Sequence, residues 1–358
     1  MTARARIAVV GAGWWSSTAH LPGLVADPRA EIVGICDPEL GRAQWAAERF
    51  GSRAYTSLEA MLLEERPDGV IVATPHSTHH SIAAAALDAG CHVLIEKPLA
   101  TTAVDAWELV GLARRRDRIL AAGLTYQYAA TAPAVRDAVH DGIGELRSVN
   151  AEFSSGTLSL FAQTDAAQSS SEAAVPHGIT YSDPATGGGQ AHTQLSHLLG
   201  GLLWATGRQA ADVAAMTANH GLAVDLVDAL AFRLDGGALC VASSTGTTPQ
   251  GVPPRHRIRF HGTEGMVEWD MLGASAVVHR VGGVVTVLEN PPHLPAYGQQ
   301  RVSQSFVESI LDGVPTPAPG RAAAASVSLI EAALLAAGSG RTLSVPQAPD
   351  GVLEGGLL

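Results

Sequence analysis

Residues 7–16 read Ile7-Ala-Val-Val-Gly-Ala-Gly-Trp-Trp-Ser16, an apolar strand that runs into a glycine turn and then into a helical stretch. Gly11 and Gly13 allow a tight turn and let backbone N–H groups approach a pyrophosphate at a helix N-terminus. Ser16 replaces the third glycine of the G-x-G-x-x-G pattern, which weakens the match but keeps a small residue for helix–strand packing. The stretch predicts a dinucleotide-binding loop formed by Gly11, Ala12 and Gly13.

A carboxylate follows the second apolar run, residues 31–36. Asp37 lies roughly 20 residues beyond the glycine loop, where a carboxylate can bind the adenosine ribose hydroxyls and repel a 2′-phosphate. The alternative is a turn or helix-capping aspartate before Pro38. Together the two features favour NAD over NADP as the cofactor, although Arg42 is close enough in sequence to keep NADP open.

The first part of the chain alternates short β-branched runs with alanine-rich stretches of helical period. This alternation indicates βαβ units on a parallel sheet, and an apolar run such as 69–74 suits a sheet covered on both faces. Later strands are separated by tight turns such as Asp235-Gly-Gly237, which suggests an antiparallel sheet. We predict an α/β fold: a doubly wound Rossmann domain in residues 1–123, and an α+β substrate-binding and oligomerisation domain with a large open, mostly antiparallel sheet in residues 124–358.

Composition excludes several classes of protein. The chain has 358 residues, 46% of them hydrophobic, and a net charge of −11, which argues against disorder and against nucleic acid or anionic membrane as the main partner. No run of about 18 uncharged apolar residues occurs, and the first six residues lack the combined features of a secretion signal. The three cysteines form no pairing or metal-binding pattern, which suits a reducing cytoplasm.

The stretch His92-Val-Leu-Ile-Glu-Lys-Pro98 ends a strand with a carboxylate and an ammonium group. Ligands bind outside the carboxyl ends of parallel strands, so we expect Glu96 and Lys97 to face a cleft. A buried lysine there can stabilise a developing alkoxide or transfer a proton at a lowered pKa. The alternative is a surface ion pair beside a turn.

Short motifs follow one another along nearly the whole chain. They are Gly11-Ala-Gly13, His20-Leu-Pro22, Asp37, Ala73-Thr-Pro75 with His79, Ala89-Gly-Cys-His-Val93, Glu96-Lys-Pro98, Gly187-Gly-Gly189 with His197, Gly262-Thr-Glu-Gly265 and residues 306–313. This ordered set resembles the Gfo/Idh/MocA oxidoreductases, the glucose-fructose oxidoreductase and inositol dehydrogenase family. The resemblance implies hydride transfer between a nicotinamide and a hydroxyl-bearing carbon of a sugar, polyol or cyclitol, by a homodimer or homotetramer assembled through the second sheet.

The resemblance also implies roles for individual residues. Lys97 matches the family's active-site lysine, and His197 the histidine that deprotonates the reacting hydroxyl in many members. Thr74, Pro75 and His79 match the loop on the nicotinamide side, and Glu96 stands beside them. The positions of Trp14 and Trp15 leave two readings open, packing in the core or covering the cofactor and cleft.

Two positions depart from the family pattern. Thr193 stands where many members carry an aspartate four residues before the histidine, and Gly200 where they carry a second one. A histidine without an anionic neighbour is expected to be a weaker base. Substrate contacts are then expected from Gln190, His192 or Gln194, and from Tyr126 and Gln127, which replace frequent arginines; these changes suggest a neutral or glycosidic substrate.

The remaining candidates concern metals and other functions. His76, His79 and His80 are expected in a turn after a strand with no carboxylate or cysteine partner, and His192 and His197 miss the spacing for chelation from one helix face, so we predict no metal site. The polar segment 156–189 is expected to cover the cleft. Two other functions remain open: NAD-dependent glycoside cleavage by oxidation, elimination and re-reduction, and a non-catalytic nucleotide-binding regulatory protein.

Overall fold

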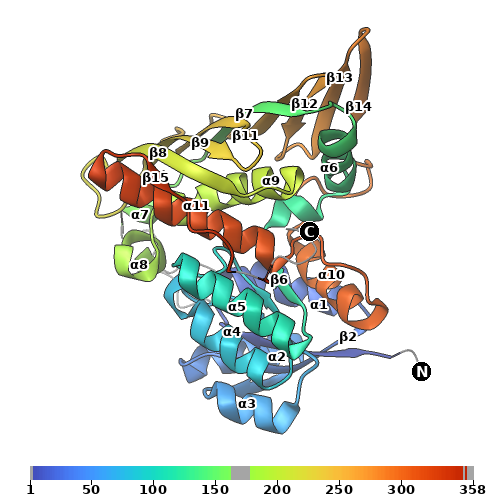
Figure 1. Cartoon of the computed structure of the whole chain (residues 1–358). Helices are drawn as coiled ribbons and strands as arrows, with labels where there is room; N and C mark the ends of the chain where they lie inside the picture. Colours follow the sequence, from blue (N-terminus) through green and yellow to red (C-terminus); the bar gives the residue numbers. More distant parts are fainter. Residues whose placement is uncertain (1–2, 163–177, 350, 353–358) are drawn as a thin grey trace.

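The computed structural model describes residues 3–162, 178–349 and 351–352. Two sheets organise them, with helices packed around the first and between the two (Figure 1). Sheet A holds six parallel strands in the order β3-β2-β1-β4-β5-β6, so its strand order reverses between β1 and β4. Such a reversal opens a crevice at the carboxyl ends of the strands, where dinucleotides bind.

The elements of sheet A follow the predicted βαβ alternation. The strands are β1 (Ala5–Val10), β2 (Ala30–Cys36), β3 (Arg53–Tyr55), β4 (Gly69–Val72), β5 (His92–Ile95) and β6 (Leu120–Ala122). The helices among them are α1 (Leu21–Ala26), α2 (Leu40–Phe50), α3 (Leu58–Glu65), α4 (His79–Asp88) and α5 (Ala103–Arg116). Every residue of β4 is buried, as expected of a strand covered on both faces.

Sheet B is a nine-stranded sheet in the order β14-β13-β12-β11-β7-β10-β9-β8-β15. Its strands are β7 (Leu146–Ser154), β8 (Ala210–Ala218), β9 (Val227–Leu234), β10 (Leu239–Thr245), β11 (Arg255–Gly262), β12 (Gly265–Asp270), β13 (Ser275–Arg280), β14 (Val284–Leu288) and β15 (Leu343–Ser344). Every neighbouring pair is antiparallel except β7 and β10, which are parallel. Burial alternates residue by residue along β9, because one face packs on helices and the other meets solvent.

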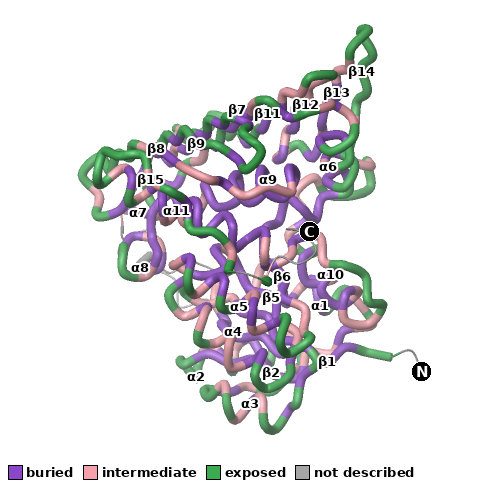
Figure 2. Tube along the Cα trace, viewed as in Figure 1, coloured by how far each residue is buried: buried purple, intermediate pink, exposed green. Residues whose placement is uncertain are grey.

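Helices α6 (Ala132–Asp141), α9 (Ser196–Thr206) and α11 (Gly320–Ser339) pack against sheet B, whereas α10 (Gln299–Asp312) packs against α1 beside sheet A. Figure 2 shows buried residues between the sheet and its helices and exposed residues along its outer side. By length and composition α11 is the one helix in the described residues that could cross a membrane, and 67% of that stretch is buried inside the fold. It packs against β8, α5 and α9, as a core helix does.

The predicted fold class is confirmed, and the differences are local. The sequence reading missed β3 and β15, which have three and two residues, too few to establish a period. Two helices are preceded by π-helical turns, at Ser16–His20 before α1 and at Ala191–Leu195 before α9. The segment 156–189 contains α7 (Leu158–Phe161) and α8 (Gly178–Ser182), while its residues 163–177 lie outside the described part.

Candidate active site

A cavity of about 690 Å³ opens at the carboxyl ends of β1, β4 and β5. We call it the cleft cavity. Its lining comprises Gly11, Gly13, Trp14, Trp15, Asp37, Pro38, Glu39, Arg42, Ala73, Thr74, Pro75, His76, Glu96, Lys97, Leu160, Thr180, Tyr181, Thr193, Gln194, His197, Tyr297 and Gln299. The glycine loop, the Glu-Lys pair and the predicted histidine thus face one space, although they come from distant parts of the chain.

The glycine loop is held in a backbone form that requires glycine at its first position. Gly11 has φ of +94°, and a Cβ there would collide with the Ala73 carbonyl oxygen. A Cβ on Gly13 would meet nothing within 4 Å, so the backbone there borders open space. The Ser16 hydroxyl donates to the Gly11 carbonyl, so the serine both supplies the small side chain and ties the turn.

Asp37 stabilises the turn after β2 and also borders the cleft cavity. Its Oδ2 accepts a hydrogen bond from the Ala12 amide at 2.9 Å, and its Oδ1 accepts one from the Glu39 amide at 3.0 Å. These bonds fix the carboxylate at the end of β2 and stabilise the turn there. The side chain nevertheless lines the cleft cavity, whereas Ala12 is buried behind it.

Trp14 and Trp15 form a wall of the cleft cavity. Both are half-buried, and their rings lie 5.3 Å apart between centroids. The Trp15 Nε1 donates to Glu96 Oε1 at 2.8 Å, and His20 Nε2 lies 2.9 Å from the same oxygen. Burial opposes ionisation of Glu96, but the His20 hydrogen bond and the Lys97 charge outweigh it and lower the pKa of the carboxyl. Glu96 is thus an anchored anion.

The Lys97 side chain contacts the second half of the chain. Its Nζ donates to the Thr193 carbonyl oxygen at 2.9 Å, which connects the end of β5 to the π-helical turn before α9. Burial lowers the pKa of the Lys97 ammonium, and the neighbouring Glu96 carboxylate opposes that change. A desolvated ammonium at this position can stabilise negative charge that develops on a substrate oxygen.

His197 lies at the start of α9 and borders the cleft cavity. It is 7% exposed, and its Nδ1 has no hydrogen-bond partner among the described residues. Burial, then the positive charge of Lys97, then His256 lower the pKa of its imidazole well below the usual value. The ring is therefore neutral at pH 7 and able to accept a proton. Thr193 Oγ1 is likewise buried without a partner in this part of the structure.

A carboxylate explains the last glycine of the triple glycine before this turn. Gly189 has φ of +99°, and a Cβ there would collide with Asp225 Oδ1. Asp225 Oδ2 accepts a hydrogen bond from the Ala191 amide at 2.7 Å, which fixes the start of the turn that carries Thr193. Asp228 lies beside it, and burial followed by Asp225 raises its pKa to about 9. Loss of solvent and the neighbouring carboxylate both favour the protonated form of Asp228.

Four predicted contact residues do not reach the lining of the cleft cavity. The Tyr126 hydroxyl and His256 Nδ1 lie 2.6 Å apart, and the Tyr126 ring packs edge-on against His197. Gln127 Nε2 donates to the Gly200 carbonyl, and Gln190 Nε2 to Ser244 Oγ at 2.8 Å. The fourth, His192, is absent from the lining as well. These side chains contact groups inside the protein, and their predicted contacts with substrate stay a prediction.

The nicotinamide-side loop is only partly in the cavity. Thr74 and Pro75 line it, whereas His79 is fully buried and contacts the Pro98 and Thr74 carbonyl oxygens. His79 therefore holds the loop to the Lys97–Pro98 turn. His80 lies beside Glu108 and Asp105 of α5, so the sequence reading that these histidines have no nearby carboxylate is wrong. That partly exposed group lies outside the lining of the cleft cavity.

Sequence reasoning missed His76 as a cavity residue. Its Nδ1 donates to the Gly187 carbonyl at 2.8 Å, which leaves Nε2 with a lone pair. Burial and then Lys97 lower its pKa well below the usual value. Tyr297 and Gln299, from the segment before and at the start of α10, were also missed, and no motif marks them. Leu160, Thr180 and Tyr181 line the cavity from the segment predicted to cover it.

Known proteins match both parts of the chain. The model of the Gfo/Idh/MocA oxidoreductase family, NAD-binding Rossmann fold, matches residues 5–124, and the model of the Gfo/Idh/MocA C-terminal domain matches residues 134–268. The strand-order reversal, the loop with φ of +94° at Gly11 and the carboxylate of Asp37 fit a dinucleotide. Residues 5–124 thus form an NAD-binding Rossmann unit.

Individual relatives act on sugars by name. D-glucoside 3-dehydrogenase of Escherichia coli (strain K12) is 35% identical over 143 residues, 39% of this chain and 41% of the relative. A dTDP-3,4-didehydro-2,6-dideoxy-alpha-D-glucose 3-reductase of Streptomyces antibioticus is 36% identical over 151 residues, 42% of this chain and 46% of the relative. The matched stretch thus spans less than half the length of each of these curated relatives.

Solved structures extend the likeness to nearly the whole chain. GenD2 from gentamicin A biosynthesis, solved with NAD, has a TM-score of 0.76 and 25% identity and covers 97% of this chain and 98% of its own. An oxidoreductase domain protein from Kribbella flavida has a TM-score of 0.82 at 21% identity and covers 97% of this chain and 100% of its own, which shows the shared fold. On these family matches and this fold, the chain belongs to the Gfo/Idh/MocA oxidoreductase family.

Proposed function

We propose that the protein is an NAD-dependent dehydrogenase or reductase that acts on the carbon-3 hydroxyl or ketone of a hexose derivative. The observation that carries the proposal is the single cavity that joins the glycine loop to Lys97 and His197. The proposed position on the sugar is supported by the relatives, whose names place their reaction at carbon 3 of a glucoside or a deoxyglucose nucleotide.

In the oxidation direction His197 accepts the proton of the reacting hydroxyl. Its depressed pKa keeps it neutral and ready to do so. Lys97 lies close enough to shift that pKa by its charge, and its ammonium stabilises the developing alkoxide. NAD, when bound, supplies the acceptor for the hydride. In the reduction direction His197 returns the proton to the oxygen.

The pattern of charges favours a neutral substrate. Thr193 brings a hydroxyl to the position where many family members carry a carboxylate, and that hydroxyl has no partner in the described part of the protein. Tyr181, Gln194 and Gln299 add polar atoms to the same lining. Apart from Lys97, the lining contains one strongly basic side chain, Arg42, beside Asp37 at the cofactor end. A glycoside therefore suits this cavity better than a sugar acid.

Variants of both reacting groups test the assignment. We expect Lys97→Ala and His197→Ala each to lower kcat by roughly 10²–10⁴, the usual contribution of a positioned acid–base group. NAD reduction is measured over a panel of methyl glucosides, free hexoses and hexuronic acids. His80→Ala is the matched control, because this histidine lies outside the cleft cavity. Undiminished rates in both site variants contradict the assignment, and a preference for hexuronic acids contradicts the neutral substrate.

Glycoside cleavage is a second candidate function, favoured by the likeness to a glucoside 3-dehydrogenase. A ketone at carbon 3 acidifies the hydrogen on carbon 2 and permits loss of the aglycone from carbon 1. Water then adds at carbon 1 and a proton returns to carbon 2, and NADH reduces the ketone, which restores NAD. His76, with its free Nε2 in the cleft cavity, is placed to remove that proton. Release of p-nitrophenol from its glucoside without net NADH supports cleavage, whereas NADH formed in step with oxidised glycoside supports the dehydrogenase.

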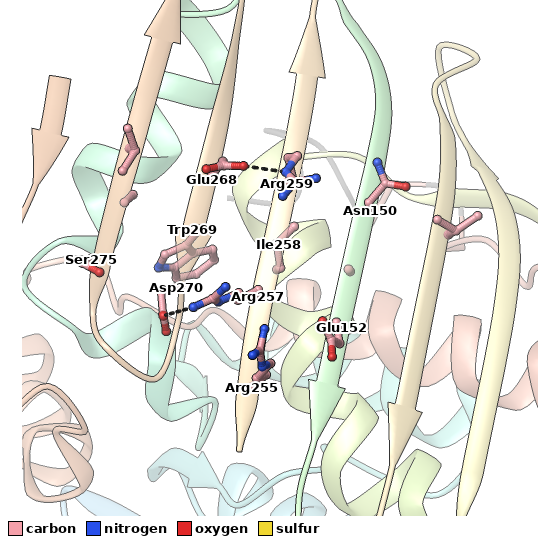
Figure 3. Close-up of a pocket in the computed structure, with 14 residues that line it drawn as sticks. Asn150, Glu152, Arg255, Arg257, Ile258, Arg259, Glu268, Trp269, Asp270 and Ser275 are labelled. Atoms are coloured by element: carbon pink, nitrogen blue, oxygen red, sulfur yellow. Dashed lines mark hydrogen bonds and ion pairs between the residues drawn. The ribbon is translucent and has the colours of Figure 1, made fainter. Parts of the chain in front are cut away.

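We further propose that copies of the chain associate through the outer face of sheet B. Figure 3 shows Arg255, Arg257 and Arg259 in a row on β11, with acidic side chains from the flanking strands beside them. Arg257 and Arg259 pair with Asp270 and Glu268. Such alternating charge is complementary to a second copy of itself. Light scattering should give a dimer or tetramer that Arg257→Glu weakens; an unchanged mass contradicts this face.

Two broader assignments remain proposals. We propose that the chain divides near residue 123 into a cofactor domain, residues 1–123, and a substrate and association domain, residues 124–358. Limited proteolysis that yields stable fragments on either side of this point supports the division.

We also propose a cytoplasmic location, supported by three buried cysteines that carry no disulfide. Fractionation that finds the protein outside the cytoplasm contradicts it.

A further inference from the structure

We propose a second ligand site, separate from the cleft cavity, that binds the phosphate group of a small molecule at the start of α11. A cavity of about 390 Å³ lies there, between the beginning of β6, helix α6, the end of α10 and the first residues of α11. We call it the α11 pocket. Its lining comprises Ile119, Leu120, Arg136, Ser309, Gly313, Val314, Pro315, Thr316, Pro319 and Arg321.

The lining carries two guanidinium groups and no carboxylate. Arg321 is the second residue of α11, and Arg136 comes from α6 on the other side. Among the described residues neither forms an ion pair; the Arg136 guanidinium lies 5.4 Å from the centre of the Trp204 ring. Many other arginines of the described chain have an acidic partner, among them Arg29, Arg53 and Arg301. Two guanidinium groups without a carboxylate in one lining, in a chain of net charge −11, point to an external anion.

Ser309 places a buried hydroxyl without a partner among the described residues in the lining of the α11 pocket. This residue of α10 is 2% exposed and belongs to the lining, and its Oγ has no hydrogen-bond partner in the described structure. A buried hydroxyl without a partner costs free energy on the order of 1–3 kcal/mol. A phosphate oxygen in the α11 pocket offers the acceptor that the protein does not supply.

The backbone adds to the same field. Helix α11 has 20 residues and no acidic side chain in its first turn. Its positive dipole end therefore meets the α11 pocket without compensation. Burial lowers the pKa of the Arg321 guanidinium, which reflects a cation that has lost water without gaining a counter-charge. A phosphate would restore that counter-charge through two parallel N–H···O hydrogen bonds.

The volume sets the class of ligand. A cavity near 390 Å³ falls within the range of small-molecule sites and exceeds what free phosphate fills. The apolar residues Ile119, Leu120, Val314 and Pro315 provide a surface for the body of a metabolite. A phosphate monoester, such as a sugar phosphate, therefore fits better than inorganic phosphate alone.

Binding measurements at constant ionic strength test the site. The protein is saturated with NAD, so that the glycine loop does not take up phosphate, and titrated with inorganic phosphate, glucose 6-phosphate and glucose. We expect saturable binding of glucose 6-phosphate and weaker binding of inorganic phosphate, whereas glucose, which lacks the phosphate, should bind no differently to wild type and to Arg321→Gln. Arg321→Gln should weaken glucose 6-phosphate binding at least tenfold, and Ser309→Ala should weaken it to a smaller extent.

Controls separate this site from the cofactor cleft and from misfolding. Arg42→Gln removes a cation from the cleft cavity and should leave glucose 6-phosphate binding unchanged. Arg321→Gln is partly exposed and should keep the melting temperature of the ligand-free protein. Equal binding of wild type and Arg321→Gln overturns the proposal, as does binding that Arg42→Gln abolishes, or the absence of saturable binding. None of these results depends on the proposed sugar dehydrogenase activity.

Discussion

Asp228→Asn should make the protein more stable, and the gain should grow as the pH rises. Asp228 is 1% exposed, and both its carboxyl oxygens lack a donor among the described residues. Burial and then Asp225 raise its pKa to about 9, against about 3.9 in an unfolded chain. The folded protein therefore keeps a proton that the unfolded chain releases above pH 4. An asparagine keeps the shape, needs no proton and can donate its N–H to Asp225.

The size of the effect follows from proton linkage. Between pH 4 and 9 the folded state binds one proton more than the unfolded state, so the stability of the wild type falls by about 1.4 kcal/mol per pH unit from this group. From pH 5 to pH 8 the loss is about 4 kcal/mol. Asp228→Asn removes this dependence, so its advantage in unfolding free energy should widen by roughly the same amount across that range.

Urea denaturation at pH 5, 6, 7 and 8 measures the difference. The matched control is Asp212→Asn on β8, an exposed carboxylate that pairs with Arg233 and should show no widening gap. A difference between wild type and Asp228→Asn that stays constant over the four pH values refutes the raised pKa of Asp228. Activity should survive, because Asp225 still accepts from the Ala191 amide and holds the start of the π-helical turn.

Three further predictions concern the cleft. Gly189→Ala should lower both the melting temperature and kcat, since its Cβ would displace Asp225; Gly13→Ala, whose Cβ meets open space, is the stability control, and equal melting temperatures would contradict the reasoning. Asp37→Ser should weaken NAD binding and shift the preference from NAD toward NADP, measured as the ratio of the two kcat/KM values. An unchanged ratio would mean that the Asp37 carboxylate only stabilises the turn after β2. The pH profile of kcat/KM for oxidation should lose its acidic limb below pH 6.5, since neutral His197 is the active form and its pKa is lowered. Its alkaline limb should lie below 10.5, since Lys97 must keep its proton and its pKa is lowered too; an acidic limb above pH 6.5 would argue against His197 as the base.

Local patterns carried most of the fold. The apolar run before Gly11, the positive φ that its turn needs and the Glu96-Lys97 pair after β5 are all readable without tertiary contacts. The carboxyl ends of parallel strands always meet at one edge of the sheet, so these motifs had to face the same crevice. The glycine turns later in the chain likewise predicted antiparallel strands. The residues with positive φ between those strands are Gly236, Gly237, Gly282 and Gly283.

The direction of individual side chains was less accessible. Tyr126 and Gln127 sit in a short 3-10 turn, and Gln190 directly precedes a π-helical turn; neither geometry keeps the face that an α-helical spacing predicts. Their partners, His256, Gly200 and Ser244, lie 54 to 130 residues away. His76 and Tyr297 are the opposite case: they line the cleft cavity, although no local pattern distinguishes them from surface residues.

The sequence by itself determined the class of the protein: a parallel sheet with a phosphate loop, a lysine at a strand end and a histidine beyond three glycines. Periodicity and turn chemistry are local properties, so they can be recognised from the order of the residues alone. Only the tertiary structure decided which of the polar residues share a cavity, that burial beside Asp225 raises the pKa of Asp228, and that Arg136 and Arg321 line one pocket without a carboxylate. Charges and hydrogen bonds depend on distance and burial, and folding sets both between residues far apart in the chain.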